Sequence, residues 1–557
     1  MKKYYLIVMA AIATGFLLNS CSQKDGQFSS NNNLALNDSS YFETRGLNYF
    51  VFSNLYDAAF DDSKISAVEI IHHGIRTATN GDVRMNPTPG QWDLLPKYID
   101  RIIDKENKRI DVKLSYTKYE FDYTLSGEAK DGGFYLSVSV EKPIPDALNG
   151  VAGLNLEFMP PCLFGNAYAM DGQNGLFPTS PADNMTTING QVEPLPIVKG
   201  KKIEIAPDDP MKHITISTTG DYEIMLFDGR NKQQNGNFVV RTLLPAGKTG
   251  KIVEWFITAE TKSDWIRQPV IAHSQVGYHP LQNKMAVIEL DKNDKPLSSV
   301  SLLKVNNDGS TTDVLSATPK EWGIYTRYNY LQFDFSSVTE SGIYVLEYGK
   351  QRTAPFPIAN NVFEKTWYPT LGIFLPVQMD HVFVREAYRV WHGASHLDDA
   401  LQAPVNYAHW DGWRQGATTG NKYKPLEHIP GLNVGGWFDA GDFDIQTNSQ
   451  QFVVQSLSML WENFAPKYDE TTVNQKTRYV DIHVPDGQPD VLQQIEHGTL
   501  QLVAQIKSIG YAIMGINESH LYQYRHLGDA LTKTDNLIYN PSLDSLQVQG
   551  NTSGTLD

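Results

Sequence analysis

Two aspartates three positions apart, Asp439 and Asp442, are the residues best suited to chemistry in this chain. Ala440 and Gly441 between them are small, so a tight turn can direct both carboxylates at one water molecule. Inverting cleavage of a glycosidic bond needs one carboxylate that takes a proton from water, and a protonated carboxyl about 6.5–9.5 Å away that protonates the leaving oxygen. An isolated Asp-x-Gly-Asp is usually only a turn. The residues around the pair must therefore decide between a turn and a site.

Aromatic side chains near this pair could bind the faces of sugar rings. Trp437 stands just before the pair, and His396 is a further candidate contact for a substrate. Trp410 and Trp413 lie in a glycine-containing segment, where cleft lining and local packing explain them equally well. Asp444 is one more carboxylate beside the pair, and its position favours a helix N-terminus over a second base.

The length and charge of the chain limit what can surround these residues. A chain of 557 residues exceeds what one hydrophobic core usually supports, so we expect about three domains. The formal net charge is -16, with Lys and Arg dispersed along the chain, which argues against a surface for nucleic acid or another polyanion. Neutral or small-molecule partners are expected instead.

Residues 1–21 have the features of a lipoprotein signal peptide. Lys2 and Lys3 precede an apolar run at 6–18, which is too short to span a bilayer as a mature helix. The run closes on Leu-Asn-Ser-Cys at 18–21, which resembles the lipobox of bacterial lipoproteins; an ordinary signal peptide with an incidental Cys21 is the alternative. The only other cysteine is Cys162, so no intramolecular disulfide can form once Cys21 carries lipid. We therefore expect a lipid anchor in a membrane, at the outer membrane, cell surface or periplasm of a Gram-negative bacterium.

The next two segments differ in composition. Residues 22–47, rich in Ser, Asn and Asp, are predicted to form a flexible tether. Between 48 and 262, short alternating apolar runs separated by turn residues predict a β-sandwich of unknown role. Trp92 and Trp255 could form a sugar-binding face there, but core packing is the favoured explanation. His72 and His73 lack a spaced carboxylate partner, so a chance pair is favoured over a metal site.

A second β-domain is predicted at 268–358, where the strands have the spacing of a small immunoglobulin-like sandwich. Gln-Val-Gly-Tyr-His-Pro at 275–280, followed by Lys-Met-Ala-Val at 284–287, resembles the opening of the immunoglobulin-like domain that precedes many catalytic domains of glycoside hydrolase family 9. Ser-Gly-Ile-Tyr at 341–344 fits the last hairpin of that domain. The resemblance implies a structural role, because the family uses this module to buttress its catalytic domain.

From residue 361 onward the pattern becomes helical. Apolar residues at three- and four-residue steps predict helices at 362–371, 383–389, 445–464 and 491–509. Gly-Gly-Trp-Phe-Asp-Ala-Gly-Asp at 435–442 resembles the family 9 signature, and Pro-Asp-Val-Leu-Gln-Gln-Ile at 489–495 resembles the start of the family's next helix. The resemblance implies that 361–557 is the N-terminal part of an (α/α)6 barrel. It also implies that Asp442 is the general base and that Asp439 helps to hold the water.

The same resemblance implies an inverting β-1,4-glucanase that acts on cellulose, mixed-linkage glucan or xyloglucan. No organic cofactor is needed, and calcium is possible in the complete catalytic domain. The family's general acid is a Glu near the end of a longer catalytic domain than this chain holds. We therefore expect the chain to lack the acid, to be part of a longer gene product, and to be inactive by itself.

One departure from the family pattern concerns a structural zinc that some members carry. A Cys-His pair and an upstream Cys form that site, whereas this chain has Ser395 before His396, and Asp380 with His381 at the upstream position. Thiolates are the usual ligands of such closed zinc sites. An Asp380, His381 and His396 site can be drafted, but we do not expect it.

A second class of function stays open: a non-catalytic surface lipoprotein that binds glycans, with a degenerate catalytic domain. A reading frame that continues beyond Asp557 into helices with a Glu and a His/Arg segment would favour the enzyme. Exo action and amino-sugar substrates also stay open, because nothing in the sequence specifies the hydroxyl pattern of the sugar.

Overall fold

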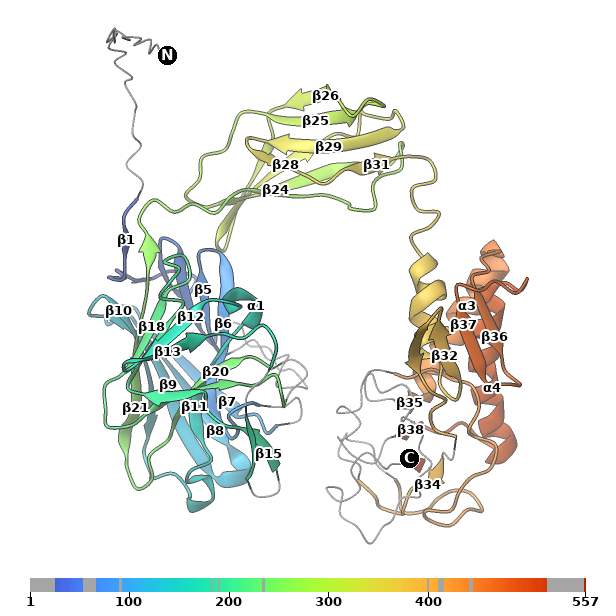
Figure 1. The fold of residues 1–557 in the computed structure, drawn as a ribbon, viewed down its shortest axis with the longest axis horizontal. Helices are drawn as coiled ribbons and strands as arrows, with labels where there is room; N and C mark the ends of the chain where they lie inside the picture. The colour runs from blue at the N-terminus through green and yellow to red at the C-terminus, as the bar shows by residue number, and fades with distance from the viewer. Residues whose placement is uncertain are drawn as a thin grey trace, which may run out of the picture.

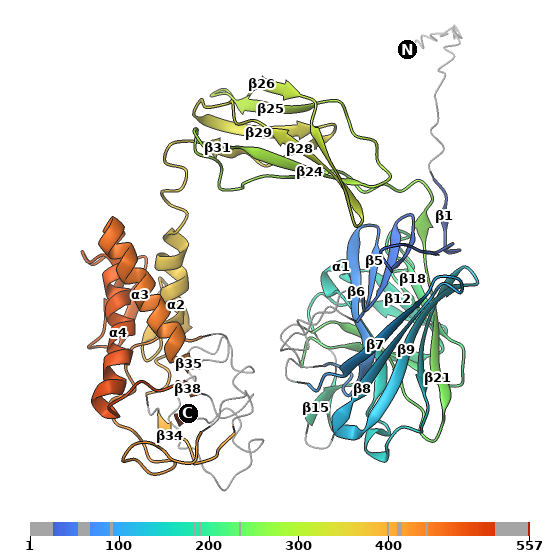
Figure 2. The ribbon, with the colours of Figure 1, turned by 180° about the vertical axis from the view of Figure 1, so that it is seen from behind.

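The computed structural model describes residues 26–53, 67–89, 93–181, 184–188, 191–232, 236–397, 400–408, 415–439, 444–517 and 555–556. Three folded parts follow one another along the chain: two β-sandwiches, and then a mixed part that holds the long helices (Figure 1, Figure 2). The predicted signal peptide, with Cys21, lies outside the described residues. No helix in the described ranges is both long enough and apolar enough to cross a membrane.

Two nine-stranded antiparallel sheets build the first part. In spatial order, one sheet contains β13 (Gln173–Leu176), β12 (Ala167–Met170), β17 (Lys202–Ile205), β18 (Ile214–Thr218), β21 (Gly250–Ala259), β10 (Gly133–Val140), β9 (Phe121–Lys130), β8 (Arg109–Tyr116) and β7 (Lys97–Asp104). The other contains β16 (Val198–Gly200), β19 (Ile224–Asp228), β20 (Phe238–Leu243), β11 (Gly153–Phe158), β6 (Ile75–Arg84), β5 (Val68–His72), β4 (Leu47–Val51), β3 (Phe42–Thr44) and β2 (Ala35–Leu36). Small elements complete it: β1 (Phe28–Ser29) with β22 (Thr261–Lys262), β14 (Met185–Ile188) with β15 (Gln191–Pro194), α1 (Pro160–Leu163), η2 (Thr117–Tyr119) and η3 (Asp146–Leu148).

One large apolar core lies between these sheets. In β4, Leu47, Tyr49 and Val51 are buried and alternate with more exposed neighbours, as the two-residue period of a strand requires. Trp255 is fully buried, and its Nε1 donates to Thr242 Oγ1 at 2.9 Å. The predicted β-sandwich is confirmed, and Trp255 is a core residue; Trp92 lies outside the described residues.

The prediction of a flexible tether at 22–47 is wrong for residues 26–47. Leu34 and Phe42 belong to the core. Asn32 pairs with Ala259 in both directions: its Nδ2 donates to the Ala259 carbonyl at 2.8 Å, and its Oδ1 accepts from the Ala259 amide at 3.0 Å. The segment folds because asparagine amides take the hydrogen-bonding role of backbone groups, so no long apolar pattern is needed.

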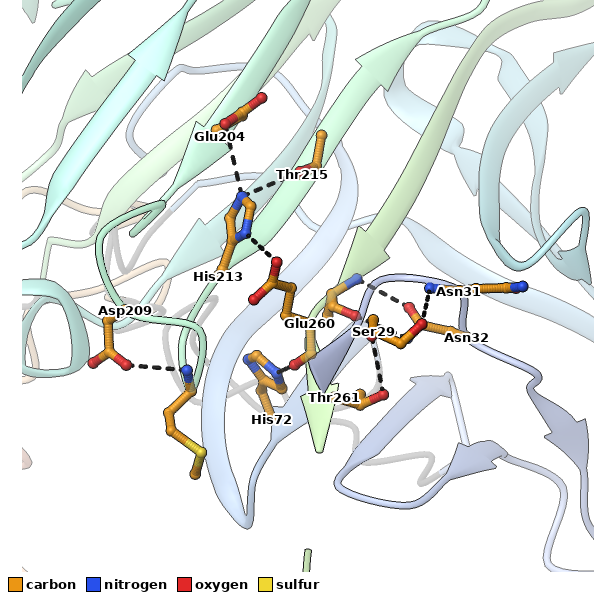
Figure 3. A network of polar contacts seen from close by, with 12 residues as sticks. Ser29, Asn31, Asn32, His72, Glu204, Asp209, His213, Thr215, Glu260 and Thr261 are labelled. Atoms are coloured by element: carbon orange, nitrogen blue, oxygen red, sulfur yellow. Dashed lines mark hydrogen bonds and ion pairs between the residues drawn. The ribbon is translucent and has the colours of Figure 1, made fainter. Parts of the chain in front are cut away.

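The adjacent histidines of β5 and its hairpin turn connect the sandwich strands. His72 Nε2 donates to the Glu260 carbonyl at 2.7 Å, and His73 Nδ1 donates to the Met211 carbonyl at 2.8 Å. Figure 3 shows His213 nearby, with its Nδ1 3.4 Å from a Glu260 carboxylate oxygen. Among the described residues no His, Cys, Asp and Glu group has the geometry of a metal site. The two rings therefore act as hydrogen-bond donors to the backbone.

The second part is a smaller sandwich around its own core. One sheet contains β23 (Val270–Ala272), β24 (Met285–Asp291), β28 (Tyr328–Asp334) and β27 (Lys320–Tyr325). The other contains β26 (Thr311–Ala317), β25 (Val300–Val305), β29 (Gly342–Tyr348) and β30 (Gln351–Arg352), with β31 (Phe356–Ile358) also paired to β29. Gly277 has a φ of 103°, and a Cβ there would lie 2.2 Å from the Pro357 carbonyl oxygen. Its neighbour Tyr278 is buried in the core, which explains the Gly-Tyr sequence.

The third part is mixed. Its helices are η4 (a π-helix, Thr370–Phe374), α2 (Leu375–Gln378), α3 (Thr447–Phe464) and α4 (Asp490–Ser508). One sheet contains β33 (Arg389–His392), β32 (Phe383–Glu386), β37 (Tyr479–Ile482) and β36 (Thr471–Asn474); the other contains β34 (Leu401–Gln402), β39 (Thr555–Leu556), β38 (Gly515–Asn517) and β35 (Ile445–Gln446). Helices α2, α3 and α4 lie together in both views (Figure 1, Figure 2).

The helix predictions have three outcomes. Those at 445–464 and 491–509 are confirmed as α3 and α4, within two residues at each end. The helix at 362–371 is wrong over most of its length, because 361–367 are turns and helical structure begins at Tyr368. The helix at 383–389 is also wrong: β32 occupies Phe383–Glu386 and pairs in parallel with β37. There, sheet pairing of a short apolar stretch overrides its helical spacing.

Helix α3 leaves apolar side chains exposed. Phe452 and Met459, seven positions apart and so on one helix face, are 67% and 55% exposed, and Phe464 is 77% exposed. On the opposite side, Leu457 belongs to the core that α3 shares with α4. The helix therefore has two apolar faces, of which the described residues cover one.

We predict that acid destabilises the first sandwich through His72. Burial, and then the neighbouring His73, lower the pKa of His72 to about 3, whereas an unfolded histidine has a pKa of about 6.5. Below about pH 6.5 the unfolded chain binds a proton that the folded chain excludes. The free energy of unfolding should therefore fall as the pH drops from about 6.5 toward about 3, by up to about 1.4 kcal/mol per pH unit for this group.

The pH dependence of the thermal unfolding midpoint checks this in wild type and His72→Gln. Gln retains an N–H donor for the Glu260 carbonyl but does not titrate, so its midpoint should fall less steeply below pH 6.5. His279→Gln, in the second sandwich, controls for the loss of one imidazole and should keep the steep dependence. Parallel curves for wild type and His72→Gln would contradict the prediction.

Candidate active site

The loop that carries the Asp pair lies between segments that approach it very closely. Gly435 and Gly436 have φ values of 68° and 84°, which L side chains rarely adopt. A Cβ on Gly435 would lie 2.2 Å from the His497 carbonyl oxygen of α4. The Gly435 carbonyl accepts from His381 Nδ1 at 2.8 Å, and the Gly436 carbonyl accepts from the Asp380 amide at 2.9 Å. Gly435 is therefore required by conformation and by close contact, and Gly436 by conformation.

The ring of Trp437, whose contact with a sugar stays a prediction, packs inside the third part of the chain. It is 3% exposed, and its Nε1 donates to Gln494 Oε1 on α4 at 2.8 Å. Its backbone pairs with the Gln450 amide of α3 in both directions, at 2.9 and 2.8 Å. The lack of a side chain at Gly498 makes room for the indole, since a Cβ there would lie 2.3 Å from the ring. Trp437 thus anchors the loop on both long helices.

Asp439 is the one member of the pair that the described residues include. It is exposed, and its Oδ2 accepts from Gln446 Nε2 at 2.8 Å. Its amide donates to the Asp444 carbonyl at 2.8 Å and closes a short loop. Asp442 falls inside that loop and outside the described residues, so its role stays a prediction.

Asp444 does not begin a helix, contrary to the prediction. Helix α3 starts at Thr447, after the short strand β35. Asp444 is 3% exposed. Its backbone carbonyl, through the bond to Asp439, holds the far end of the loop.

His396 is oriented by a buried aspartate. Its Nδ1 lies 2.6 Å from Asp380 Oδ2, and Asp380 Oδ1 accepts from the His381 amide at 2.6 Å. Burial alone would raise the pKa of Asp380, but the charges of His381 and His396 and the hydrogen bonds from both outweigh it and lower this pKa. His396 is 3% exposed, and its contact with a sugar stays a prediction. Its edge faces Phe438, with ring centroids 5.9 Å apart.

These hydrogen bonds do not fit a zinc site. Asp380 turns both oxygens toward histidine N–H groups, and His381 Nδ1 is bonded to the Gly435 carbonyl. Ser395 Oγ lies 3.4 Å from the Gly393 carbonyl. In the described ranges no group of three or more His, Cys, Asp and Glu residues could hold a metal ion. The positions of the drafted zinc ligands therefore serve to fix the loop.

Buried amides and a buried imidazole, which were not predicted from the sequence, lie beneath the loop. Gln494, Gln501 and Gln505 are fully buried along α4, spaced by seven and four residues. In its satisfied orientation the Gln501 amide donates to the Leu432 and Val434 carbonyls. His497, on the same helix, is fully buried, and burial lowers its pKa to about 3. These polar residues stand at helix positions where the three- and four-residue spacing calls for apolar residues, and this was the signal that could have revealed their burial.

Three further tryptophans, Trp391, Trp410 and Trp413, lie in the third part of the chain. Trp410 and Trp413 lie outside the described residues, so cleft lining by either stays a prediction. Trp391, on β33, is 39% exposed, and Tyr388 in the preceding turn is 91% exposed. These two provide exposed aromatic surface in the third part of the chain.

The second sandwich matches a known family of domains. Residues 267–353 match the family model described as the cellulase N-terminal immunoglobulin-like domain. A search of curated proteins returned no match.

Solved structures give distant likenesses. A metagenome-derived glycoside hydrolase family 9 endoglucanase is similar at 21% identity over 44% of this chain and 42% of its own, with a TM-score of 0.33. A family 9 glycoside hydrolase of Bacteroides ovatus is similar at 19% identity over 44% and 41%, with a TM-score of 0.31. Family 9 endoglucanase J30 is similar at 19% identity over 43% and 40%, with a TM-score of 0.30.

The matched region thus spans less than half the length of these structures. The chain is a mostly β, multidomain protein, and its residues 267–353 match the immunoglobulin-like domain found at the N-terminus of cellulases.

Proposed function

We propose that this chain is part of an inverting glycoside hydrolase that cleaves β-1,4-linked glucans such as cellulose, mixed-linkage glucan or xyloglucan. The observation that carries the proposal is the loop at 435–439, which buried side chains of α3 and α4 fix in place while Asp439 stays exposed. A rigid loop with an exposed carboxylate at its tip is what a positioned water molecule requires. The cellulase-type domain directly before it supports the same assignment.

In the proposed mechanism two carboxylates act on one water. Asp439, held by Gln446, orients the water, and Asp442 takes its proton as the oxygen attacks the anomeric carbon. A carboxylic acid on the other side of the bond protonates the leaving oxygen, so the product has inverted configuration. In the family that acid is a Glu in the later part of the catalytic domain. The reaction uses only carboxyl groups and water, with no organic cofactor, and calcium would serve the complete domain structurally.

The proposed setting is a helical barrel of the (α/α)6 type. Helices α3 and α4 share one apolar core, and the exposed Phe452 and Met459 give α3 a second apolar face suited to a neighbouring helix. Loops between helix pairs of such a barrel can line an extended cleft for a polymer.

We predict that Asp442→Asn, in the enzyme with its complete catalytic domain, lowers kcat by about 10²- to 10⁴-fold with glucan binding largely intact. The carboxamide keeps the size of Asp but cannot accept the proton. Asp439→Asn should cost nearly as much, because a misplaced water is also lost catalysis. Glu462→Gln, at an exposed carboxylate of α3 outside the loop, is the matched control and should keep normal turnover.

Azide separates the two roles, because it attacks without losing a proton. It should restore glycosyl transfer to Asp442→Asn and give an α-glycosyl azide from a β-glucan. Near-normal turnover of Asp442→Asn, or a β-glycosyl azide, would exclude Asp442 as the base of a single inverting displacement. Glucan binding without turnover in the complete wild-type domain would instead favour a glycan-binding lipoprotein.

We also propose that Cys21 carries a lipid and holds the protein at the outer membrane, at the cell surface or on the periplasmic side. Cys21→Ser should move the protein from the membrane to the soluble fraction, since each lost methylene removes about 0.8 kcal/mol of membrane binding. Fractionation followed by immunoblotting measures this. Cys162→Ser, at the other cysteine, should leave the membrane fraction unchanged. If Cys21→Ser stays with the membrane, this anchor is excluded.

A further inference from the structure

A cavity of about 330 Å³ lies where the two β-sandwiches meet. The first sandwich contributes the β3–β4 turn and the tip of the β5–β6 hairpin, and the second contributes the turns after β24 and before β28. Trp265 and Arg267, in the connection between the two, complete the lining. We call this cavity the junction pocket. Its volume is at the lower end of the roughly 300–1,000 Å³ of small-molecule sites.

Four cationic side chains line the junction pocket, and two of them are already neutralised. Lys292 pairs with Glu43 across the domain boundary. Arg267 Nη1 lies 2.7 Å from Glu289 Oε1.

Arg45 and Arg327 differ from these two. Both are half-buried in the lining, and neither forms a hydrogen bond or an ion pair with a residue in the described ranges. The charge of Arg327 acts on the Glu69 carboxylate, but the two form no ion pair. Glu69 instead accepts from Thr79 Oγ1 at 2.9 Å and lies 3.4 Å from Arg76 Nη1. The pocket therefore contains two guanidinium groups whose donors the protein does not use.

Two aromatic rings lie within cation–π distance of one of these groups and do not use its donors. The Arg327 guanidinium lies 5.1 Å from the centroid of the Tyr328 ring and 5.7 Å from that of Phe50. A cation–π contact leaves the N–H groups of a guanidinium free, and these can bind a carboxylate with two parallel hydrogen bonds. The donors of Arg327 are thus available to an anion.

The remaining lining suits a sugar ring. Trp265 packs at the tip of the β5–β6 hairpin, where a Cβ on Gly74 would lie 3.3 Å from the indole ring. The ring centroids of Trp265 and His73 are 5.4 Å apart. Asn48 and Thr44 also line the pocket and can exchange hydrogen bonds with hydroxyl groups. The Asn293 amide already donates to Asp291, a carboxylate in the lining that also accepts from the Arg267 amide. Aromatic faces beside a few directed polar groups are the usual composition of such sites.

We propose that the junction pocket binds a carboxylate-bearing sugar residue, such as a glucuronyl unit, with its carboxylate on Arg45 and Arg327 and its ring beside Trp265. The net charge of -16 disfavours a long polyanion, whereas a single carboxylate fits two local cations. The site lies outside the part of the chain that holds Asp439 and Asp442, and it does not depend on the proposed hydrolysis.

Calorimetric titration of the full chain with two matched sugars tests the proposal. Methyl β-D-glucuronide and methyl β-D-glucoside differ only in a carboxylate against a hydroxymethyl group. The glucuronide should bind at least about tenfold more tightly, because hydrogen bonds between charged groups exceed neutral ones, and added salt should reduce the difference. Sulfate should bind more weakly than the glucuronide, since it has no ring for Trp265.

Variants locate the binding. Arg45→Gln should weaken glucuronide binding at least about tenfold, and Trp265→Leu should weaken both sugars. Arg327→Lys keeps the charge but not the planar fork and should also weaken the glucuronide; its unfolding midpoint shows whether the domain junction stays intact. Arg352→Gln, on the exposed edge of the second sandwich, is the matched control and should change nothing.

Three results would overturn the proposal: no glucuronide binding at millimolar concentration, equal binding of glucuronide and glucoside, or sulfate binding as tight as the glucuronide. The last would identify a simple oxyanion site. None of them bears on Asp442, whose test is the azide reaction.

Discussion

The reciprocal hydrogen bonding between Gln450 and the backbone of Trp437 is the constraint on which the third part of the chain depends. An irregular loop that is buried has backbone groups with no ladder partners, and each unpaired group costs stability. Gln450 on α3 and Gln501 on α4 supply those partners from two helices. The side-chain amides thus allow a non-repetitive segment to lie between regular elements.

The position of the reactive residues follows from that anchoring. Trp437 is buried against α3 and α4, whereas Asp439, two residues later, lies at the protein surface and is exposed. On the other side, the backbone of Asp380 and the ring of His381 bond to the carbonyls of Gly436 and Gly435. The loop is therefore held from three directions, and a side chain at Gly435 would collide with the backbone of α4.

The sequence predicted what depends on local pattern and missed what depends on distant partners. The periodicity of α3 and α4 and the Gly-Tyr turn at 277–278 were readable, because each follows from neighbouring residues. The strand β32 was misassigned because its parallel partner β37 lies almost a hundred positions away. Trp437 was assigned to sugar binding because its type suits that role, whereas its burial depends on a missing side chain at Gly498.

The arginines of the two β-sandwiches differ in burial and in the number of hydrogen-bond acceptors around them. Arg241 is 2% exposed, and it donates to the carbonyls of Asn86, Arg84 and Val151 and to Asn155 Oδ1. A buried guanidinium that lacked such acceptors would pay a desolvation cost of several kcal/mol. Arg45 and Arg327 have no such acceptors in the described residues, and they stay half-buried at a cavity instead. Their donors are therefore open to water or to a ligand at the junction pocket, and the aromatic rings beside Arg327 offer an apolar surface next to them.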